Sequence, residues 1–287
     1  MKGTFRERPD HPHVALRQNL LDSRRGYAPP LTPLRGRAGA PRETALTVLD
    51  TQLRPHGIGL LDLDRVMSNE EFRAFGAALG TAQPERSADV AGMVDDDVIL
   101  NVRTCGPVTE DPARQPFAAN WLTLHTESSG APVTAQPRYV VLMCVAATEQ
   151  GAAGQTVLVA MPDVHDALSP ATRDLLRHLR YDGRGGVPAL LRPCDGRPVF
   201  SLRDFHRTPM DWSLDTRAGD PAEVNRALAE VYAALYGSRC SGLSWVSGRL
   251  VVIDNTRYFH GRTRALEPAP GRVRHLKRLR VLSASGR

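Results

Sequence analysis

Two histidines and one glutamate carry the clearest chemical signal in the sequence. His125 and Glu127 stand two positions apart in Leu124-His125-Thr126-Glu127, and His260 lies far along the chain. Residues two apart on a β-strand point to the same face, so His125 and Glu127 can share one metal ion while Thr126 points away. A distant histidine can complete the set. Two imidazoles and one carboxylate on one face of an octahedron leave three positions open, an arrangement that suits Fe(II) oxygenases.

The same three ligands leave other functions open. Zinc also accepts two histidines and a glutamate, so a metal-dependent hydrolase or isomerase on a cupin-like jelly roll is an alternative. A non-catalytic small-molecule binding protein is another. The sequence has no H-E-x-x-H motif, which would put a general-base glutamate on a helix beside the metal. The complete triad and Arg274 argue against a protein that only binds.

The elements that must position these ligands are mainly short strands. Six apolar segments have the length and the β-branched residues of strands: residues 57–63, 98–102, 139–145, 156–159, 250–253 and 279–282. Helices are expected over residues 162–180 and 220–237. A third helix begins at the capping box Ser68-x-x-Glu71 and ends near Gly80. This order predicts an α+β fold with a double-stranded β-helix (jelly roll) core and flanking helices.

Composition narrows the class of protein. Hydrophobic residues make up 41% and charged residues 24% of the 287 residues, which is ordinary for a globular domain. The net charge of +6 comes from scattered arginines, with no aromatic-basic recognition motif, so we expect no nucleic-acid partner. No apolar run approaches the ~20 residues that span a bilayer, and the first residues lack the pattern of a signal peptide. We therefore expect a cytoplasmic protein with no membrane partner.

The first part of the chain differs from the rest. Residues 1–45 are rich in Pro, Arg and Gly, so we expect little regular structure there and interpret them as an N-terminal arm. Residues 46–287 form the predicted catalytic domain. The four cysteines are far apart in the sequence and form no C-x-x-C pair, which indicates reduced thiols rather than a zinc ribbon.

The order of motifs resembles one enzyme family. From about residue 57 to residue 281 the chain is similar to the taurine dioxygenase and clavaminate synthase-like family of Fe(II)/2-oxoglutarate-dependent oxygenases. The resemblance lies in LTLHTE (residues 122–127), RYVVLMC (138–144) and VIDNTRYFHGR (252–262). A glutamate in the His-x-Glu motif, where taurine dioxygenase has an aspartate, points to the clavaminate synthase branch. The resemblance implies a dioxygenase that binds Fe(II), uses 2-oxoglutarate and O₂ as co-substrates, and hydroxylates, desaturates or cyclises a small substrate.

The resemblance also implies roles for single residues. His125, Glu127 and His260 become the catalytic metal ligands. Thr156, in GAAGQT (residues 151–156), matches the family threonine that binds a co-substrate carboxylate. In RHLKR (residues 274–278), Arg274 matches the arginine that holds the distal carboxylate of 2-oxoglutarate, and Arg278 would approach the metal-side carboxylate. Because Arg272 and Arg280 lie on the same strand face, a shift of two positions would assign these roles to the wrong arginines.

The substrate is expected to be a small molecule, either a free or carrier-bound amino acid or a related specialised metabolite. Hydroxylases of this branch act on such substrates, and several hold a basic side chain with an acidic residue that precedes the distal histidine. Three aspartates in residues 203–215 are therefore candidate substrate-binding residues: Asp204, Asp211 and Asp215. They lead to the prediction that the substrate carries a cationic amino or guanidino group.

Overall fold

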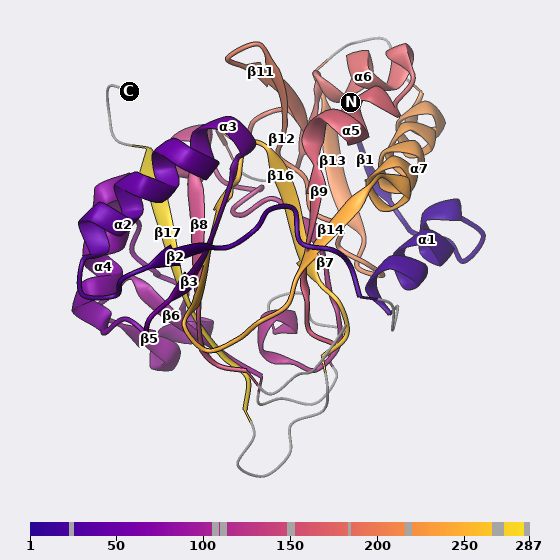
Figure 1. Ribbon diagram of the computed structural model, residues 1–287. Coiled ribbons are helices and arrows are strands. Elements are labelled where there is room, and N and C mark those ends of the chain that lie inside the picture. Colours follow the sequence, from indigo (N-terminus) through magenta and orange to yellow (C-terminus); the bar gives the residue numbers. More distant parts are fainter. Residues whose placement is uncertain are drawn as a thin grey trace.

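A computed structural model describes residues 1–22, 26–104, 109, 114–147, 153–182, 185–215, 220–265 and 273–283. Two β-sheets lie face to face, with helices on the outer side of each (Figure 1). The larger sheet has the strand order β2-β3-β15-β8-β17-β6-β5, with β4 paired to β17, and the smaller has the order β14-β9-β16-β7. The structure is therefore an α+β fold, as expected.

The larger sheet consists of β2 (Leu34–Gly36), β3 (Ile58–Leu63), β4 (Gly80–Ala82), β5 (Val94–Asp95), β6 (Ile99–Arg103), β8 (Tyr139–Ala146), β15 (Arg249–Asp254) and β17 (His275–Ser283). The smaller sheet consists of β7 (Leu122–His125), β9 (Thr156–Ala160), β14 (Cys240–Leu243) and β16 (Tyr258–Arg262). A three-stranded sheet contains β1 (Lys2–Phe5), β10 (Leu179–Tyr181) and β13 (Met210–Leu214), and a hairpin contains β11 (Leu191–Cys194) and β12 (Arg197–Phe200).

The helices are α1 (Pro12–Leu21), α2 (Pro41–Val48), α3 (Arg54–His56), α4 (Asn69–Leu79), α5 (Met161–Asp166), α6 (Pro170–Leu176) and α7 (Pro221–Gly237). A π-helical turn, η1 (Leu49–Leu53), joins α2 to α3. The 3₁₀ turns η2 (Ala88–Met93), η3 (Gln115–Phe117) and η4 (Val133–Ala135) lie between strands. In Figure 1, α2 and α4 cover the larger sheet, while α5, α6 and α7 lie beyond the smaller one. No described helix is long and apolar enough to cross a membrane.

Local sequence signals account for most of these elements. Each of the six predicted strand segments lies in a strand of one of the two facing sheets. The capping box is present: Ser68 Oγ accepts from the Glu71 amide, and the Glu71 carboxylate accepts from the Ser68 amide. The expected helix over residues 162–180 is wrong, because it is two short helices followed by β10. Ser169 caps the second of them, and Pro170, which has no amide hydrogen, begins it.

The expectation of little regular structure in residues 1–45 is also wrong. This stretch contains β1, α1 and β2 and the beginning of α2. β1 pairs with β13 in antiparallel register, from Lys2 opposite Ser213 to Phe5 opposite Met210. Proline begins both helices, where a missing amide hydrogen costs nothing. Of the prolines in this stretch, Pro12 and Pro41 are thus helix-starting residues, whereas Pro29, Pro30 and Pro33 lie outside the helices.

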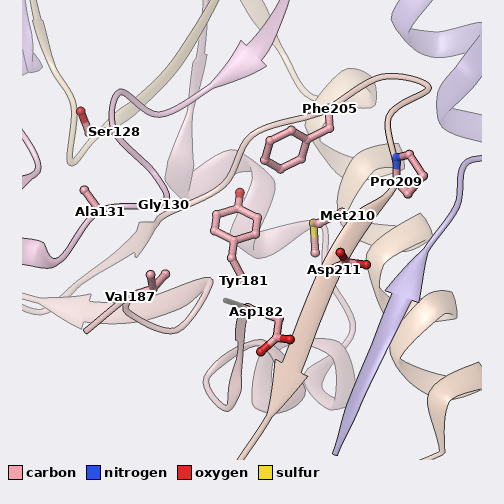
Figure 2. A pocket seen from close by; sticks show the side chains of 10 residues that line it. All are labelled: Ser128, Gly130, Ala131, Tyr181, Asp182, Val187, Phe205, Pro209, Met210 and Asp211. Atoms are coloured by element: carbon pink, nitrogen blue, oxygen red, sulfur yellow. The ribbon is translucent and has the colours of Figure 1, made fainter. Parts of the chain in front are cut away.

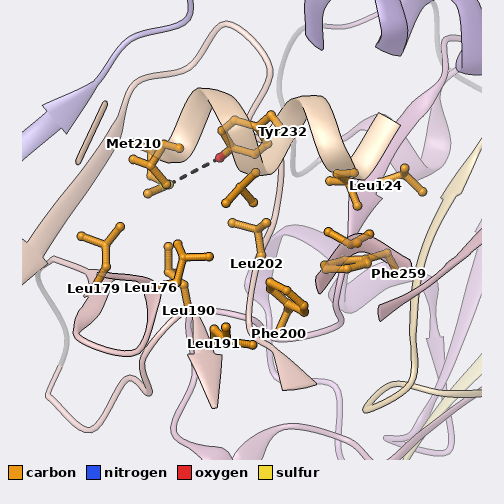
Figure 3. Close-up of a cluster of buried hydrophobic side chains, with 14 of the residues drawn as sticks. Leu124, Leu176, Leu179, Leu190, Leu191, Phe200, Leu202, Met210, Tyr232 and Phe259 are labelled. Carbon is orange, nitrogen blue, oxygen red and sulfur yellow. Dashed lines mark hydrogen bonds between the residues drawn. The ribbon is translucent and has the colours of Figure 1, made fainter. Parts of the chain in front are cut away.

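Apolar side chains alternate between two layers along each strand of the sheets. In β3, Ile58 and Leu60 point between the two sheets, whereas Leu61 and Leu63 pack against α2 and α4. A further cluster lies between the smaller sheet and α7, and Figure 3 shows its inner residues, from Leu124 in β7 to Met210 and Tyr232. The strands of the smaller sheet are therefore held on both faces, and the site lies on the face toward the larger sheet.

Candidate metal centre

The three candidate metal ligands come together between the two sheets. His260 in β16 is the antiparallel partner of His125 in β7. The Nε2 atom of His125 lies 4.0 Å from Oε2 of Glu127, and the Nε2 atom of His260 lies 3.8 Å from the same oxygen. One donor atom from each of the three residues lies within 4.8 Å of the others. Sequence positions separated by more than a hundred residues therefore converge on one point.

The donor set fits one small cation. Ligand atoms at about 2.1 Å from an ion and at right angles to each other are about 3 Å apart, so each histidine Nε2 and Oε2 of Glu127 must approach each other by only about 1 Å. His125 Nδ1 lies 2.8 Å from the carbonyl oxygen of Thr123, which leaves Nε2 of that imidazole to face the ion. All three ligands are buried, with exposures of 6–8%. A set of two imidazoles and one carboxylate that leaves one side open matches the facial triad of Fe(II) oxygenases.

The position of Glu127 depends on a neighbouring turn rather than on a strand. We expected His125 and Glu127 to lie on the same strand, but β7 ends at His125. The side chain of Asn255 makes the backbone hydrogen bonds that a neighbouring strand would otherwise make. Its Oδ1 accepts from the Glu127 amide at 2.7 Å, and its Nδ2 donates to the Glu127 carbonyl at 3.2 Å. Ser128 then has a left-handed backbone, with φ of 58°. Asn255 thus fixes the backbone of the carboxylate ligand.

The charges around the site favour the ligand forms of these side chains. Burial, followed by repulsion from His260, holds the pKa of His125 well below its usual value, so this imidazole is neutral. Burial alone would raise the pKa of Glu127. The Arg278 guanidinium and a hydrogen bond with His260 outweigh burial and hold that pKa well below its usual value. A neutral imidazole and an ionised carboxylate are the forms that bind a metal ion.

A cavity of about 70 Å³ adjoins the three ligands. It is lined by Thr156, Arg274 and Arg278, the three residues expected to bind the co-substrate, together with apolar side chains of both sheets. Arg274 is 3% exposed, and its Cζ lies 5.9 Å from the ring centroid of Trp245. The indole Nε1 of Trp245 donates to Thr156 Oγ1 at 3.2 Å. The structure therefore places a guanidinium and a hydroxyl in one cavity with the triad.

Arg278 contacts one of the candidate metal ligands directly, in addition to lining the cavity. Its Nη1 donates to Glu127 Oε1 at 3.0 Å, and its Nη2 donates to Glu85 Oε2 at 2.7 Å. Arg280 approaches the same Glu85 oxygen at 3.1 Å. Because Arg278 holds Oε1 of Glu127, the other carboxylate oxygen is directed toward the histidines. Arg272, the other residue that a register shift would have brought in, lies outside the described residues.

The three candidate aspartates have different surroundings. Asp204 is 2% exposed, and its Oδ2 accepts from Arg17 Nη1 at 2.8 Å and from the Tyr236 hydroxyl at 2.6 Å. Asp215 pairs with Arg180 near the surface. Asp211 accepts from the Thr4 hydroxyl at 2.7 Å and lines a larger pocket. The structure gives each of the three different partners, and Asp211 lines a pocket of described residues.

The pocket that Asp211 lines has a volume of about 540 Å³. Figure 2 shows the rings of Tyr181 and Phe205 between the loop that contains Ser128 and the carboxylates of Asp182 and Asp211. Ser128, which lines this pocket, directly follows the metal-ligand candidate Glu127 in the chain. The two rings pack edge to face, with centroids 5.5 Å apart. This pocket joins acidic and aromatic side chains, the groups that bind organic cations.

Several residues of the site had no signal in the sequence. Trp245 and Glu85 belong to no motif, and only the tertiary structure brings them to Thr156 and Arg278. Asn255 could have been found, since it lies in the same segment as His260. Arg262, at the end of that segment, donates to the carbonyl oxygens of Gln115, Pro116, Ala118 and Asn120. It thereby holds one wall of the cavity in place.

Comparisons with known proteins agree with this geometry. Residues 36–280 match the model of the family described as "Taurine catabolism dioxygenase TauD, TfdA family". No curated protein sequence matches the chain. Among solved structures, asparagine oxygenase in complex with Fe(II), 3-hydroxyasparagine and succinate has a TM-score of 0.60 at 20% identity, over 86% of this chain and 80% of that one.

Two further structures are similar. PvcB from Pseudomonas aeruginosa has a TM-score of 0.60 at 20% identity and covers 83% of this chain and 79% of its own. The non-haem iron oxygenase OrfP in complex with (3S)-hydroxy-L-Arg, as a single-residue variant, has a TM-score of 0.60 at 18% identity. Its coverage is 97% of this chain and 93% of its own. At these identities the likeness concerns the fold.

Proposed function

The chain belongs to the taurine catabolism dioxygenase TauD, TfdA family and is a 2-oxoglutarate-dependent non-haem iron dioxygenase; on this premise we propose that His125, Glu127 and His260 are the protein ligands of its Fe(II). The observation that carries the proposal is the convergence of two Nε2 atoms on one Glu127 oxygen, at 3.8 and 4.0 Å. With Fe(II) bound, 2-oxoglutarate and O₂ are converted to succinate and CO₂ while a C–H bond of the substrate is oxidised.

Anaerobic spectroscopy tests this ligand set. Fe(II) and 2-oxoglutarate added to the protein without O₂ should produce a weak visible charge-transfer band. His125→Ala and His260→Ala should abolish it. His165→Ala is the matched control, because His165 lies on α5 beside Asp166 and away from the site. A full-strength band in either ligand variant would remove that histidine from the proposal.

We propose that different residues of the small cavity bind the two carboxylates of 2-oxoglutarate. We assign the distal carboxylate to Arg274 and Thr156. A planar guanidinium can hold a carboxylate through two parallel charge-assisted hydrogen bonds, which a lysine cannot reproduce. Because Trp245 donates to Thr156 Oγ1, the hydroxyl proton of Thr156 is left to donate to the ligand. Arg278 is the proposed contact of the metal-side carboxylate, where the ligand would compete with Glu85 for its Nη2.

We propose that the substrate is a small amino-acid-type molecule, free or carrier-bound, with a cationic amino or guanidino group. Support comes from the pocket beside Ser128, where two carboxylates and two aromatic rings face one space. Asp211 is the aspartate that fits this role; Asp204 is bound by Arg17 and Asp215 by Arg180. The similar asparagine oxygenase and OrfP are solved with hydroxylated amino acids, which agrees with this substrate class.

The proposal includes the detailed fold. We assign the two facing sheets to a double-stranded β-helix, the jelly roll, because the three ligands and the cavity lie between them. Within it, residues 46–287 are the oxygenase domain and residues 1–45 the N-terminal arm. The arm contacts the domain through β1 on β13 and α1 on α7.

A further inference from the structure

The N-terminal arm contributes a buried ion pair beside the strand that carries His125. Arg17 on α1 is 2% exposed. Its guanidinium donates to both oxygens of Glu7, at 2.6 and 2.7 Å, and to Asp204 Oδ2 at 2.8 Å. His13, which is fully buried, lies with Nε2 3.1 Å from the same Glu7. One arginine therefore joins two carboxylates, one from the arm and one from the segment that follows β12.

That segment lies along the outer edge of β7. The smaller sheet ends at β7, so one edge of this strand has no neighbour within the sheet. The chain around Asp204 supplies the missing hydrogen bonds. The Asp204 amide donates to the Leu124 carbonyl at 3.2 Å, and the Thr126 amide donates to the Leu202 carbonyl at 2.8 Å. An edge strand that bears a metal ligand thus depends on this segment for its position.

A continuous chain of hydrogen bonds links Arg17 to the imidazole of His125. Asp204, which Arg17 binds through its carboxylate, accepts at its carbonyl oxygen from the Thr123 hydroxyl at 2.7 Å. The carbonyl oxygen of Thr123 in turn lies 2.8 Å from Nδ1 of His125. Tyr236 reinforces the link, because its hydroxyl donates to Asp204 Oδ2 and accepts from the Leu124 amide.

From this chain of contacts we infer that Arg17 is a positioning residue of the metal centre: through Asp204 and Thr123 it fixes the orientation in which His125 presents Nε2 to the metal. The N-terminal arm then helps to position a ligand of the proposed iron site. A hydrogen bond to the second nitrogen of a metal-ligating histidine fixes its tautomer and ring orientation. Here the accepting carbonyl oxygen belongs to Thr123 in β7, so its position depends on the position of β7.

The inference rests on the proposed Fe(II) site and is tested by metal affinity, independently of turnover. Fe(II) dissociation constants are measured anaerobically by equilibrium dialysis, below the unfolding midpoint of each variant. Arg17→Gln should weaken Fe(II) binding by about tenfold or more, the range found when outer contacts of metal ligands are lost. Arg17→Lys, which keeps the charge, should recover part of the affinity.

Thr123→Val removes the hydroxyl that binds Asp204 but retains the shape of the side chain and leaves the ion pair intact. It should also weaken Fe(II) binding, and it keeps the test decisive if Arg17→Gln does not fold. Arg8→Gln is the matched control, because Arg8 pairs with Asp10 on the surface and should leave the affinity unchanged. Wild-type affinity in Thr123→Val, or in folded Arg17→Gln, overturns the inference. A wild-type protein that binds no Fe(II) overturns the proposed site instead.

Discussion

Arg274 offers the sharpest test of how 2-oxoglutarate is bound. The proposed change is Arg274→Ala, which removes the guanidinium from the cavity beside the metal ligands. Arg274 is 3% exposed, and its Cζ lies 5.9 Å from the ring centroid of Trp245, so the guanidinium is buried. Because Arg274 is not one of the three proposed metal ligands, Fe(II) binding should survive its removal.

The size of the effect follows from the contacts that a carboxylate would lose. A charge-assisted hydrogen bond contributes about 1.5–3 kcal/mol, and a guanidinium can make two of them to one carboxylate. Loss of both corresponds to at least about 3 kcal/mol, or roughly a hundredfold weaker binding, since each 1.36 kcal/mol is a factor of ten. A water molecule that enters the vacated space would offset part of this loss, so tenfold is the smallest effect expected.

The assay is an anaerobic titration of the Fe(II)-loaded protein with 2-oxoglutarate, followed by the visible charge-transfer band. Arg274→Ala should need much more 2-oxoglutarate to reach the same band, with unchanged Fe(II) content. Arg278→Ala is the informative comparison, because it lies on the same face of the closing strand. Near-normal 2-oxoglutarate affinity in Arg274→Ala, with the large loss in Arg278→Ala instead, would show that the distal carboxylate binds Arg278.

Three other outcomes are expected. Trp245→Phe removes the donor to Thr156 and should weaken 2-oxoglutarate two- to tenfold, roughly one neutral hydrogen bond, with Fe(II) affinity unchanged in the same titration. Asp211→Asn should raise the substrate KM, while 2-oxoglutarate decay without substrate oxidation continues; an unchanged KM argues against a cation at this aspartate. Burial alone would raise the pKa of Glu7, but His13 and Arg17 outweigh burial and lower this pKa from 4.5 to about 2. The ionised Glu7 carboxylate therefore stabilises the folded protein fully above pH 4.5, and this stabilisation is lost as the pH falls toward 2. Near neutral pH, the free energy of unfolding of the wild type should therefore exceed that of Glu7→Gln by up to about 3 kcal/mol, before allowance for solvent screening. This difference should shrink in acid. A difference that stays constant contradicts the lowered pKa of Glu7.

Local sequence patterns determine many individual elements. The strands around residues 139–145 and 250–253 follow from continuous apolar, β-branched segments that can be buried on both faces. Helix α4 follows from the capping box of Ser68 and Glu71, and α7 from Asp220 followed by a proline. The proposed roles of the triad, Thr156 and Arg274 could be predicted because these residues belong to ordered motifs. These signals are short in range, and each concerns a few adjacent residues.

Only the tertiary structure decided which distant residues share a space. Asp204, Asp211 and Asp215 are equivalent by residue type, yet one is bound by Arg17, one lines a pocket and one lies near the surface. The partners of Asp204 and Asp211 come from the N-terminal arm, Arg17 on α1 and Thr4 on β1, and no periodicity connects these segments to residues 204 and 211. The same holds for Glu85 beside Arg278. The sequence gives the charge of a side chain, but its burial and its charged partner are determined only when separate segments pack together. The reason is that electrostatic and hydrogen-bond energies depend on distance in space.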